Sequence, residues 1–415
     1  MSNGADMGAS RVRGLVLMAV LFALFGFVTW LNGVLIPFLK ILCQLTTFEA
    51  LLVTFAFYIA YFVMALPSAR VLKVTGYQRG LAYGIWIMAA GTLVFIPAAL
   101  TRYYGLFLGG LFLQGSGLCL LQTAANPYVI ALGPHASAAQ RVSIMGVCNK
   151  LAGAISPLIL GALIFADFAR LVPAGAQQLT DLTRTTLAHR LIAPYLGMIV
   201  ILATLAVVVS RVHLPVLEET RSDGPTVESQ FRWLRHPLLL LGFWALFFEM
   251  AVEVIAGDTI VLYAQSLHIP IETARYFATL TLMGMVLSYI LGVLLIPRRL
   301  SQEAALASSA ALGIVLTAAI VMTHGILSVL FVASLGVANA VLWPCIFPLA
   351  LTGLGSFTKT GSAIMIMAII GGAVVPPVYG LLAHAIGNSQ AYLLLAPMYA
   401  YILAYALFAR RFAAQ

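Results

Sequence analysis

The sequence predicts an all-α membrane protein, with about twelve transmembrane helices in two pseudo-symmetric six-helix bundles. Composition is the first reason: 62% of the 415 residues are hydrophobic and 8% are charged, whereas about a quarter of the residues in a soluble domain are charged. The second reason is a series of apolar runs, each near the length of about 20 residues that crosses a bilayer as a helix. The third is a long polar insert that separates these runs into two sets of about six.

The apolar runs define the predicted spans in chain order. Each is expected to be a helix, because lipid offers no hydrogen-bond partner to backbone N–H and C=O groups. We expect spans at 14–39, 48–69, 80–100, 104–132, 142–166, 190–210, 237–265, 276–297, 304–323, 325–353, 360–384 and 391–409.

Polar segments set the predicted domain organisation. The long insert, 212–236, is interpreted as a cytoplasmic linker between an N-terminal bundle, 1–211, and a C-terminal bundle, 237–415. A second polar segment, 167–190, is predicted to be an external loop. With the N-terminus inside the cell, most loop Lys and Arg residues fall on the cytoplasmic side, as the positive-inside tendency requires. We therefore expect an integral protein of the plasma (bacterial inner) membrane with both termini in the cytoplasm.

The sequence also disfavours several classes of protein. Basic cytoplasmic loops account for the net charge of +9, and no basic–aromatic patch indicates nucleic-acid binding. The four cysteines lie apart, without metal-ligand spacing, which favours buried and inert thiols. No nucleophile–base pair or phosphate-binding glycine loop is present in the sequence. We expect a monomer in the lipid bilayer that is not an enzyme and has no metal or cofactor, any coupling ion aside.

The two halves of the chain carry similar proline and glycine patterns. Asn126-Pro127 is followed by Pro157 and Gly161 in the first half, and Phe347-Pro348 by 376–380, which reads Pro-Pro-Val-Tyr-Gly, in the second. Repeats in the same orientation, each with an even number of spans, imply a symmetry axis along the membrane normal. In transporters built this way the solute site lies between the repeats, near the bilayer midplane.

Several stretches of the chain resemble one known family. They are residues 31–37, 122–129, 132–134 and 369–377. They make the chain similar to the major facilitator superfamily, and within it to the fucose–galactose–glucose permease group, which is fucose:proton symporter-like. Residues 252–259 resemble a sugar-transporter subgroup of that group. The resemblance implies a twelve-helix, rocker-type transporter that moves a monosaccharide, usually with a coupling cation.

The chain departs from the fucose symporter pattern in its acidic residues. That pattern places carboxylates on the first and fourth spans, where this sequence has Gly33 and Gln122, so proton coupling by that pair is not expected. The seventh span instead carries Glu249, Glu253 and Asp258, which are the candidates for cation coupling. Glu249 and Glu253 are four residues apart and share a helix face. Asp258 points away from that face unless the helix bends at the preceding glycine.

Lys150 is a basic residue well inside a predicted span, the fifth. Ionisable residues at bilayer depth usually face the bundle interior or a watery cavity and pair with one another. Lys150 can therefore form an ion pair that gates the contact between the halves, supply a fixed charge in place of a coupling cation, or donate a hydrogen bond to a sugar hydroxyl. The alternative is a lysine that extends its side chain to the inner membrane surface.

Amide and aromatic residues complete the predicted substrate site. Amides both donate and accept hydrogen bonds, as sugar hydroxyls do, and an aromatic ring can cover the apolar face of a pyranose. The alternatives are hydrogen bonds between helices for the amides and packing or interface roles for the rings. The candidates, besides Lys150, are Asn32, Gln122, Asn126, Asn149, Asn339, Trp30, Tyr263, Trp343 and Phe347.

The predicted function is secondary active import of a monosaccharide, either a hexose or an N-acetylhexosamine, by alternating access coupled to sodium or protons. An uncoupled sugar facilitator is the first alternative, because the acid pair of the fucose symporters is missing. Efflux of an apolar compound is a weaker alternative, since an apolar solute would leave the amides without partners. The expected partners are thus a small sugar and the bilayer, and no nucleic acid.

Overall fold

The computed structural model describes residues 2–132, 138–164, 180–212, 236–296, 299–354 and 358–413, and every regular element in these ranges is helical. Eleven helices in the described ranges are long and apolar enough to cross a membrane. The apolar part of α5, Ile144–Leu160, is shorter. The prediction of an all-α membrane protein is therefore confirmed.

The first half of the chain forms the helices up to α7. They are α1 (Ser2–Trp30), α2 (Asn32–Cys43), α3 (Thr47–Thr101), α4 (Tyr104–Ala131), α5 (Ala138–Ile164) and α7 (Asp181–Arg211). Helix α3 covers the second and third predicted spans and is interrupted at Gly76, where φ is 75° and ψ is 171°. This backbone conformation strongly favours glycine, so Gly76 marks the turn between the two spans.

The predicted external loop at 167–190 is too long, because α7 begins at Asp181. The hydroxyl of Thr180 accepts a hydrogen bond from the backbone N–H of Thr183 at 3.3 Å, and Asp181 lies in the first helical turn. A threonine cap and an acidic first turn both stabilise a helix start. Because the first turns of α7 are polar, hydropathy alone placed the start of this span at residue 190 and not at Asp181.

The second half begins at α9. Its helices are α9 (Pro237–Asp258), α10 (Ile260–Ser266), α11 (Ile271–Leu295), α12 (Gln302–Met322), α13 (Gly325–Asn339), α14 (Leu342–Leu351), α15 (Thr358–Met367), α16 (Gly371–Ile386), α17 (Asn388–Ala391) and α18 (Leu395–Ala413). A short 3₁₀ segment, Ala368–Ile370, joins α15 to α16.

Four predicted spans are each built from two helices; in the eleventh, 360–384, the 3₁₀ segment joins α15 to α16, and the other three are interrupted by one or two residues. The first is interrupted at Leu31, between α1 and α2, and the seventh at Thr259, between α9 and α10. The tenth is interrupted at Ala340 and Val341, between α13 and α14. The first and seventh spans occupy equivalent positions in the two halves. Discontinuous helices at equivalent positions are typical of solute sites in transporters, and hydropathy alone did not predict these interruptions.

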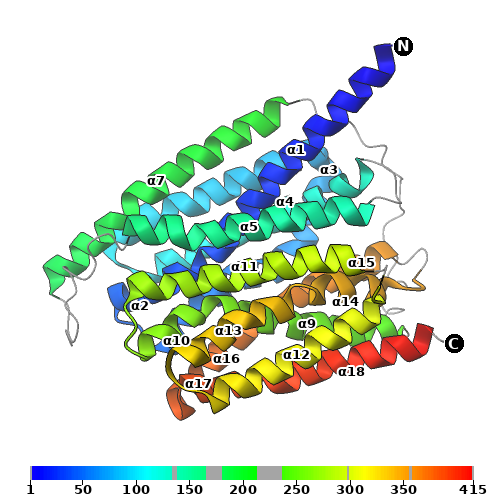
Figure 1. Ribbon diagram of the computed structural model, residues 1–415. Coiled ribbons are helices and arrows are strands. Elements are labelled where there is room, and N and C mark those ends of the chain that lie inside the picture. The colour runs from blue at the N-terminus through cyan, green and yellow to red at the C-terminus, as the bar shows by residue number, and fades with distance from the viewer. Residues whose placement is uncertain are drawn as a thin grey trace.

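The two halves lie side by side, with α5 along α11 (Figure 1). Helix α3 also contacts α16. Both termini are at one end of the bundle, and α2, α10 and α17 are at the other. At that other end Gly380 of α16 lies against Phe48 and Leu51 of α3, where a Cβ atom would come within 3.1 Å of Phe48 Cα. The halves are therefore in contact at the end opposite the termini. Most of the predicted linker, 213–235, lies outside the described residues.

Candidate functional site

A buried ion pair joins the two halves at the centre of the bundle. Lys150 Nζ of α5 lies 2.5 Å from Glu253 Oε1 of α9, and the two residues are 7% and 8% exposed. The pair lies between the first and second halves, 103 residues apart in sequence. The side chain of Lys150 therefore does not extend to the membrane surface. Of the predicted alternatives, its position matches an ion pair between the two halves.

Trp30, the last residue of α1, packs against the Lys150 side of this ion pair. Lys150 Nζ lies 4.6 Å from the centroid of the Trp30 ring, in a cation–π arrangement. One edge of the ring packs against Gly153 of α5, and the other edge packs against Gly257 of α9. A Cβ atom at either glycine would overlap the ring, so both glycines are needed for this approach. The indole thus fills the space between the halves beside the ion pair.

Glu249 lies one turn before Glu253 on α9. It is fully buried, and neither of its carboxyl oxygens has a hydrogen-bond partner among the described residues. Its carboxyl group lies close enough to Glu253 and Lys150 to interact with both electrostatically. We call Trp30, Lys150, Glu249 and Glu253 the central cluster. The shared helix face predicted for the two glutamates is confirmed by their common proximity to Lys150.

Asp258 is bonded elsewhere. Its Oδ2 accepts a hydrogen bond of 2.8 Å from the hydroxyl of Thr54 on α3, again between the halves. The expectation that Asp258 points away from the face of Glu249 and Glu253 unless the helix bends at Gly257 agrees with this position, since α9 continues as a helix through Gly257 to Asp258 and is interrupted only at Thr259. Gly257 instead provides the close approach to Trp30. Asp258 therefore closes a second polar contact between the halves and does not pair with Lys150.

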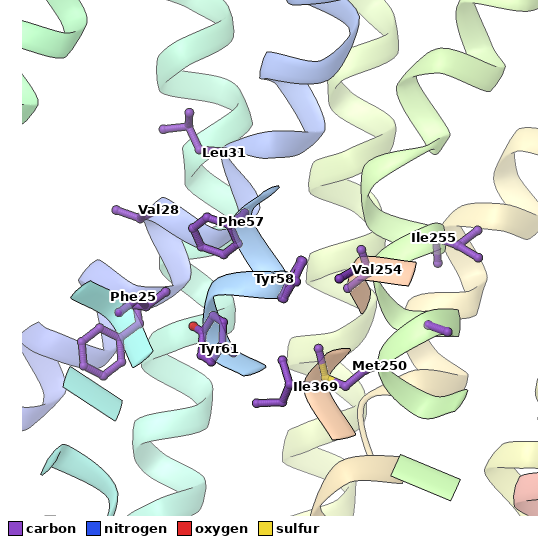
Figure 2. Close-up of a cluster of buried hydrophobic side chains, with 14 of the residues drawn as sticks. Phe25, Val28, Leu31, Phe57, Tyr58, Tyr61, Met250, Val254, Ile255 and Ile369 are labelled. Carbon is purple, nitrogen blue, oxygen red and sulfur yellow. The ribbon is translucent and has the colours of Figure 1, made fainter. Parts of the chain in front are cut away.

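Tyrosines of α3 lie between the two polar contacts. Tyr58 faces Met250 and Val254 of α9 across the interface between the halves (Figure 2). It also packs near Gly372 of α16, where a Cβ atom would be 3.5 Å from its ring. The carboxyl groups of Asp258, Glu253 and Glu249 all lie close enough to Tyr58 to interact with it electrostatically. Tyr58 was not among the predicted site residues, although a tyrosine within an apolar span was a usable signal.

The amides of α4 and α5 have protein partners. Gln122 donates a hydrogen bond of 3.2 Å to the hydroxyl of Tyr61, and it is half-buried. Asn149 donates a hydrogen bond of 3.1 Å to the carbonyl of Phe22, which ties α5 to α1. Among the described residues, each amide makes this one bond through an N–H, and its carbonyl oxygen and second N–H can each take another partner. The side chains of two further candidates, Asn32 and Asn126, lie outside the described residues.

Asn339 is placed inside the second half. It is fully buried, donates to the carbonyl of Val252 at 3.3 Å, and accepts from the hydroxyl of Tyr399 at 2.5 Å. Both bonds join α13 to neighbouring helices of the same half. This arrangement matches the alternative of an amide that links helices.

Removing this link is expected to lower stability and leave sugar affinity unchanged. Asn339→Ala leaves the Tyr399 hydroxyl without its acceptor, whereas the Val252 carbonyl lies within α9 and keeps its helical hydrogen bond; an unsatisfied buried polar group costs about 1–3 kcal/mol. We expect a lower thermal unfolding midpoint for the purified variant and a wild-type KM in sugar counterflow. Tyr399→Phe, which leaves the amide in place, should lower the midpoint less. A raised KM with an unchanged unfolding midpoint would contradict this assignment.

The aromatic candidates divide into two groups. Trp343 and Phe347 of α14 stack on each other, with ring centroids 5.8 Å apart and planes 17° apart, and both are half-buried. Tyr263 of α10 is buried, donates a hydrogen bond of 2.7 Å to Ser328 and packs against Tyr392. Tyr263 is therefore part of the packing of the second half, whereas the stacked pair presents partly open ring surface.

The site as a whole can hold the halves together or release them. Its polar contacts run between α5 and α9 and between α3 and α9, and its apolar contacts run through Trp30 and Tyr58. A buried ion pair is stable only while its partners remain together, because an unpaired charge in a dry environment is costly.

Comparison with known proteins identifies relatives along almost the whole chain. The model of the Major Facilitator Superfamily matches residues 18–369. A glucose/galactose transporter of Brucella abortus is 35% identical over 395 residues, which covers 94% of this chain and 92% of the relative. The L-fucose-proton symporter of Escherichia coli is 30% identical over 403 residues, which covers 92% of this chain and 90% of that relative. A crystal structure of the transporter FucP in the outward conformation superposes with a TM-score of 0.75 at 27% identity, covering 96% and 99%.

Proposed function

Because the chain belongs to the Major Facilitator Superfamily and is a transporter, not an enzyme, we propose that it imports a monosaccharide by alternating access. The substrate class is a hexose or an N-acetylhexosamine. The relatives named as glucose/galactose transporter and L-fucose-proton symporter support a sugar. The observation that carries the proposal is the Lys150–Glu253 pair between the halves. This pair can form only when the halves meet at the centre and must part when they separate.

The proposed sugar site lies beside the central cluster. Gln122 and Asn149 offer amide atoms that are not used by their protein partners, and the stacked Trp343 and Phe347 offer a ring face. Sugars need both kinds of contact, because their hydroxyls donate and accept hydrogen bonds while the pyranose C–H face is apolar. Binding would replace the water that these groups hold when one side of the carrier is open.

The proposed orientation places both termini in the cytoplasm. Figure 1 shows the termini at one end of the bundle, and Arg410 and Arg411 end α18 there. Basic residues concentrate on the cytoplasmic side of membrane proteins. The contact between Gly380 and Phe48 is then at the outer face, so the outer side is closed in this arrangement.

The test is sugar counterflow in liposomes that contain the purified protein. Vesicles are loaded with unlabelled D-glucose, D-galactose, L-fucose or N-acetylglucosamine, and entry of the labelled sugar is followed. We expect counterflow with at least one hexose, and Gln122→Leu should raise KM about tenfold, since a lost hydrogen-bond pair is worth about 1.4 kcal/mol. Gln390→Leu, at an exposed position of α17, is the matched control and should keep the wild-type KM. Wild-type protein that exchanges none of these sugars would refute the proposed function.

A further inference from the structure

We infer that Glu249 is a proton-binding site that must be occupied for the two halves to close at the centre of the bundle. This inference deepens the proposed alternating access and rests on it. The site is distinct from the Lys150–Glu253 pair, which holds the halves together by charge. It makes closure, and with it transport, depend on pH.

The first step of the argument is the environment of Glu249. The side chain is 0% exposed, and both carboxyl oxygens lack a hydrogen-bond partner among the described residues. A carboxylate anion without partners in a dry interior costs several kcal/mol. A neutral carboxylic acid avoids the charge and needs no counter-ion. The closed arrangement therefore favours Glu249 with a proton bound.

The second step is the balance of charge around it. Lys150 supplies one positive charge to this cluster, and its ammonium lies 2.5 Å from Glu253. Two ionised glutamates beside one lysine would leave a net negative charge in the interior. One bound proton makes the cluster neutral. Because Glu253 already has its counter-ion and Glu249 has none, the proton belongs on Glu249.

Other titratable groups near Glu249 do not change this balance. The side chains that interact with it electrostatically are Glu253 on α9, Lys150 on α5, Tyr58 on α3, Tyr289 on α11 and Tyr399 on α18. Tyrosine hydroxyls are neutral at physiological pH, with an ordinary pKa of about 10. Tyr399 is also bonded to Asn339. None of the three tyrosines supplies a positive charge to Glu249.

A sodium ion suits this arrangement less well than a proton. A hard metal cation is held by several oxygen atoms at once, and the ammonium of Lys150 already lies against the carboxylate of Glu253. A proton needs one carboxyl oxygen and no further ligands. When the halves separate and water reaches Glu249, its O–H bond breaks and the proton passes to water, leaving a hydrated carboxylate. Closure then requires the reverse step.

The test follows counterflow of D-glucose or D-galactose, whichever the protein exchanges, with the same pH on both sides of the vesicle. In the wild type, we expect the rate to fall about tenfold per pH unit on the alkaline limb, as loss of one required proton dictates. Glu249→Gln keeps the shape of the side chain without its proton, so its rate should stay within about twofold over the same range. Glu303→Gln, in the first turn of α12, is the control, and its rate should fall with rising pH as steeply as that of the wild type.

Several results would overturn the proton site. They are an alkaline limb that persists in Glu249→Gln, a wild-type rate that does not depend on pH, and a wild-type rate that requires sodium in place of choline. If Glu249→Gln is inactive in counterflow, thermal unfolding decides. The folded wild type holds a proton that the unfolded chain releases, so its unfolding midpoint should fall as pH rises, and the variant should fall less. Unfolding needs no sugar, so failure of the proposed function, seen as absent counterflow at every pH, is distinguishable from failure of this inference.

Discussion

Glu253→Gln is expected to destabilise the closed protein by about 3–5 kcal/mol, because it leaves the ammonium of Lys150 buried without a counter-charge. The pair is nearly inaccessible to water, with side chains 9% and 11% exposed. Lys150→Met should be similarly harmful, since it leaves Glu253 unpaired beside Glu249. The measurements are the thermal unfolding midpoint in detergent and the rate of sugar counterflow, both of which should fall strongly.

The double variant Lys150→Met/Glu253→Gln distinguishes the cost of an unpaired buried charge from the cost of changing the packing of the side chains. The double variant leaves no uncompensated buried charge, and replacing both members of a buried ion pair by hydrophobic residues of similar volume is often close to neutral for stability, so the double variant should recover most of the loss. The exposed pair of Arg102 and Asp181, at 3.0 Å and with side chains 32% and 82% exposed, is the control. Asp181→Asn should cost less than about 1 kcal/mol. If the two single losses simply add in the double variant, Lys150 and Glu253 are not coupled.

The sequence predicted the residues of the central cluster but not their pairing. Lys150, Glu249 and Glu253 stood out because charge at bilayer depth is rare. Their arrangement depends on how closely α5 approaches α9, and that approach is set by Gly153 and Gly257 against Trp30. Glycine spacing gives little warning of a contact between segments so far apart in the chain. Hydropathy likewise predicted the spans, while the interruption at Thr259 left no hydropathy signal.

The amides show why residue type alone does not identify a ligand contact. Asn149 and Asn339 have the same chemistry. Among the described residues, however, the half-buried Asn149 bonds only to the carbonyl of Phe22, whereas Asn339 donates to Val252 and accepts from Tyr399. A buried amide must find partners wherever it lies. Whether those partners are helices or a sugar depends on burial, which the sequence does not contain.

Gly257→Ala is expected to oppose closure of the two halves, because the new methyl group would occupy the space of the Trp30 ring. The ring cannot retreat, since its opposite edge packs against Gly153. Either α9 moves away from α5 or the indole leaves Lys150. Overpacking of this kind costs about 1–3 kcal/mol, which lowers the closed population by roughly fivefold to more than a hundredfold.

The measurement is the rate of counterflow together with the distance between spin labels placed on the two halves. Gly257→Ala should slow counterflow and lengthen that distance. Gly197→Ala in α7 and Gly109→Ala in α4 are matched controls, because neither position has a neighbouring atom within 4 Å of an added Cβ, and both should behave as wild type.

A second substitution shows whether Trp30 is the cause. Trp30→Phe removes part of the ring that meets residue 257, so Trp30→Phe/Gly257→Ala should transport faster than Gly257→Ala alone. Gly153→Ala presses on the same ring from within the first half. It should disturb Trp30 without pushing directly on α9, and the distance between halves should change less than in Gly257→Ala. Equal transport by Gly257→Ala and Gly197→Ala would mean that the indole is not a steric contact on which closure depends.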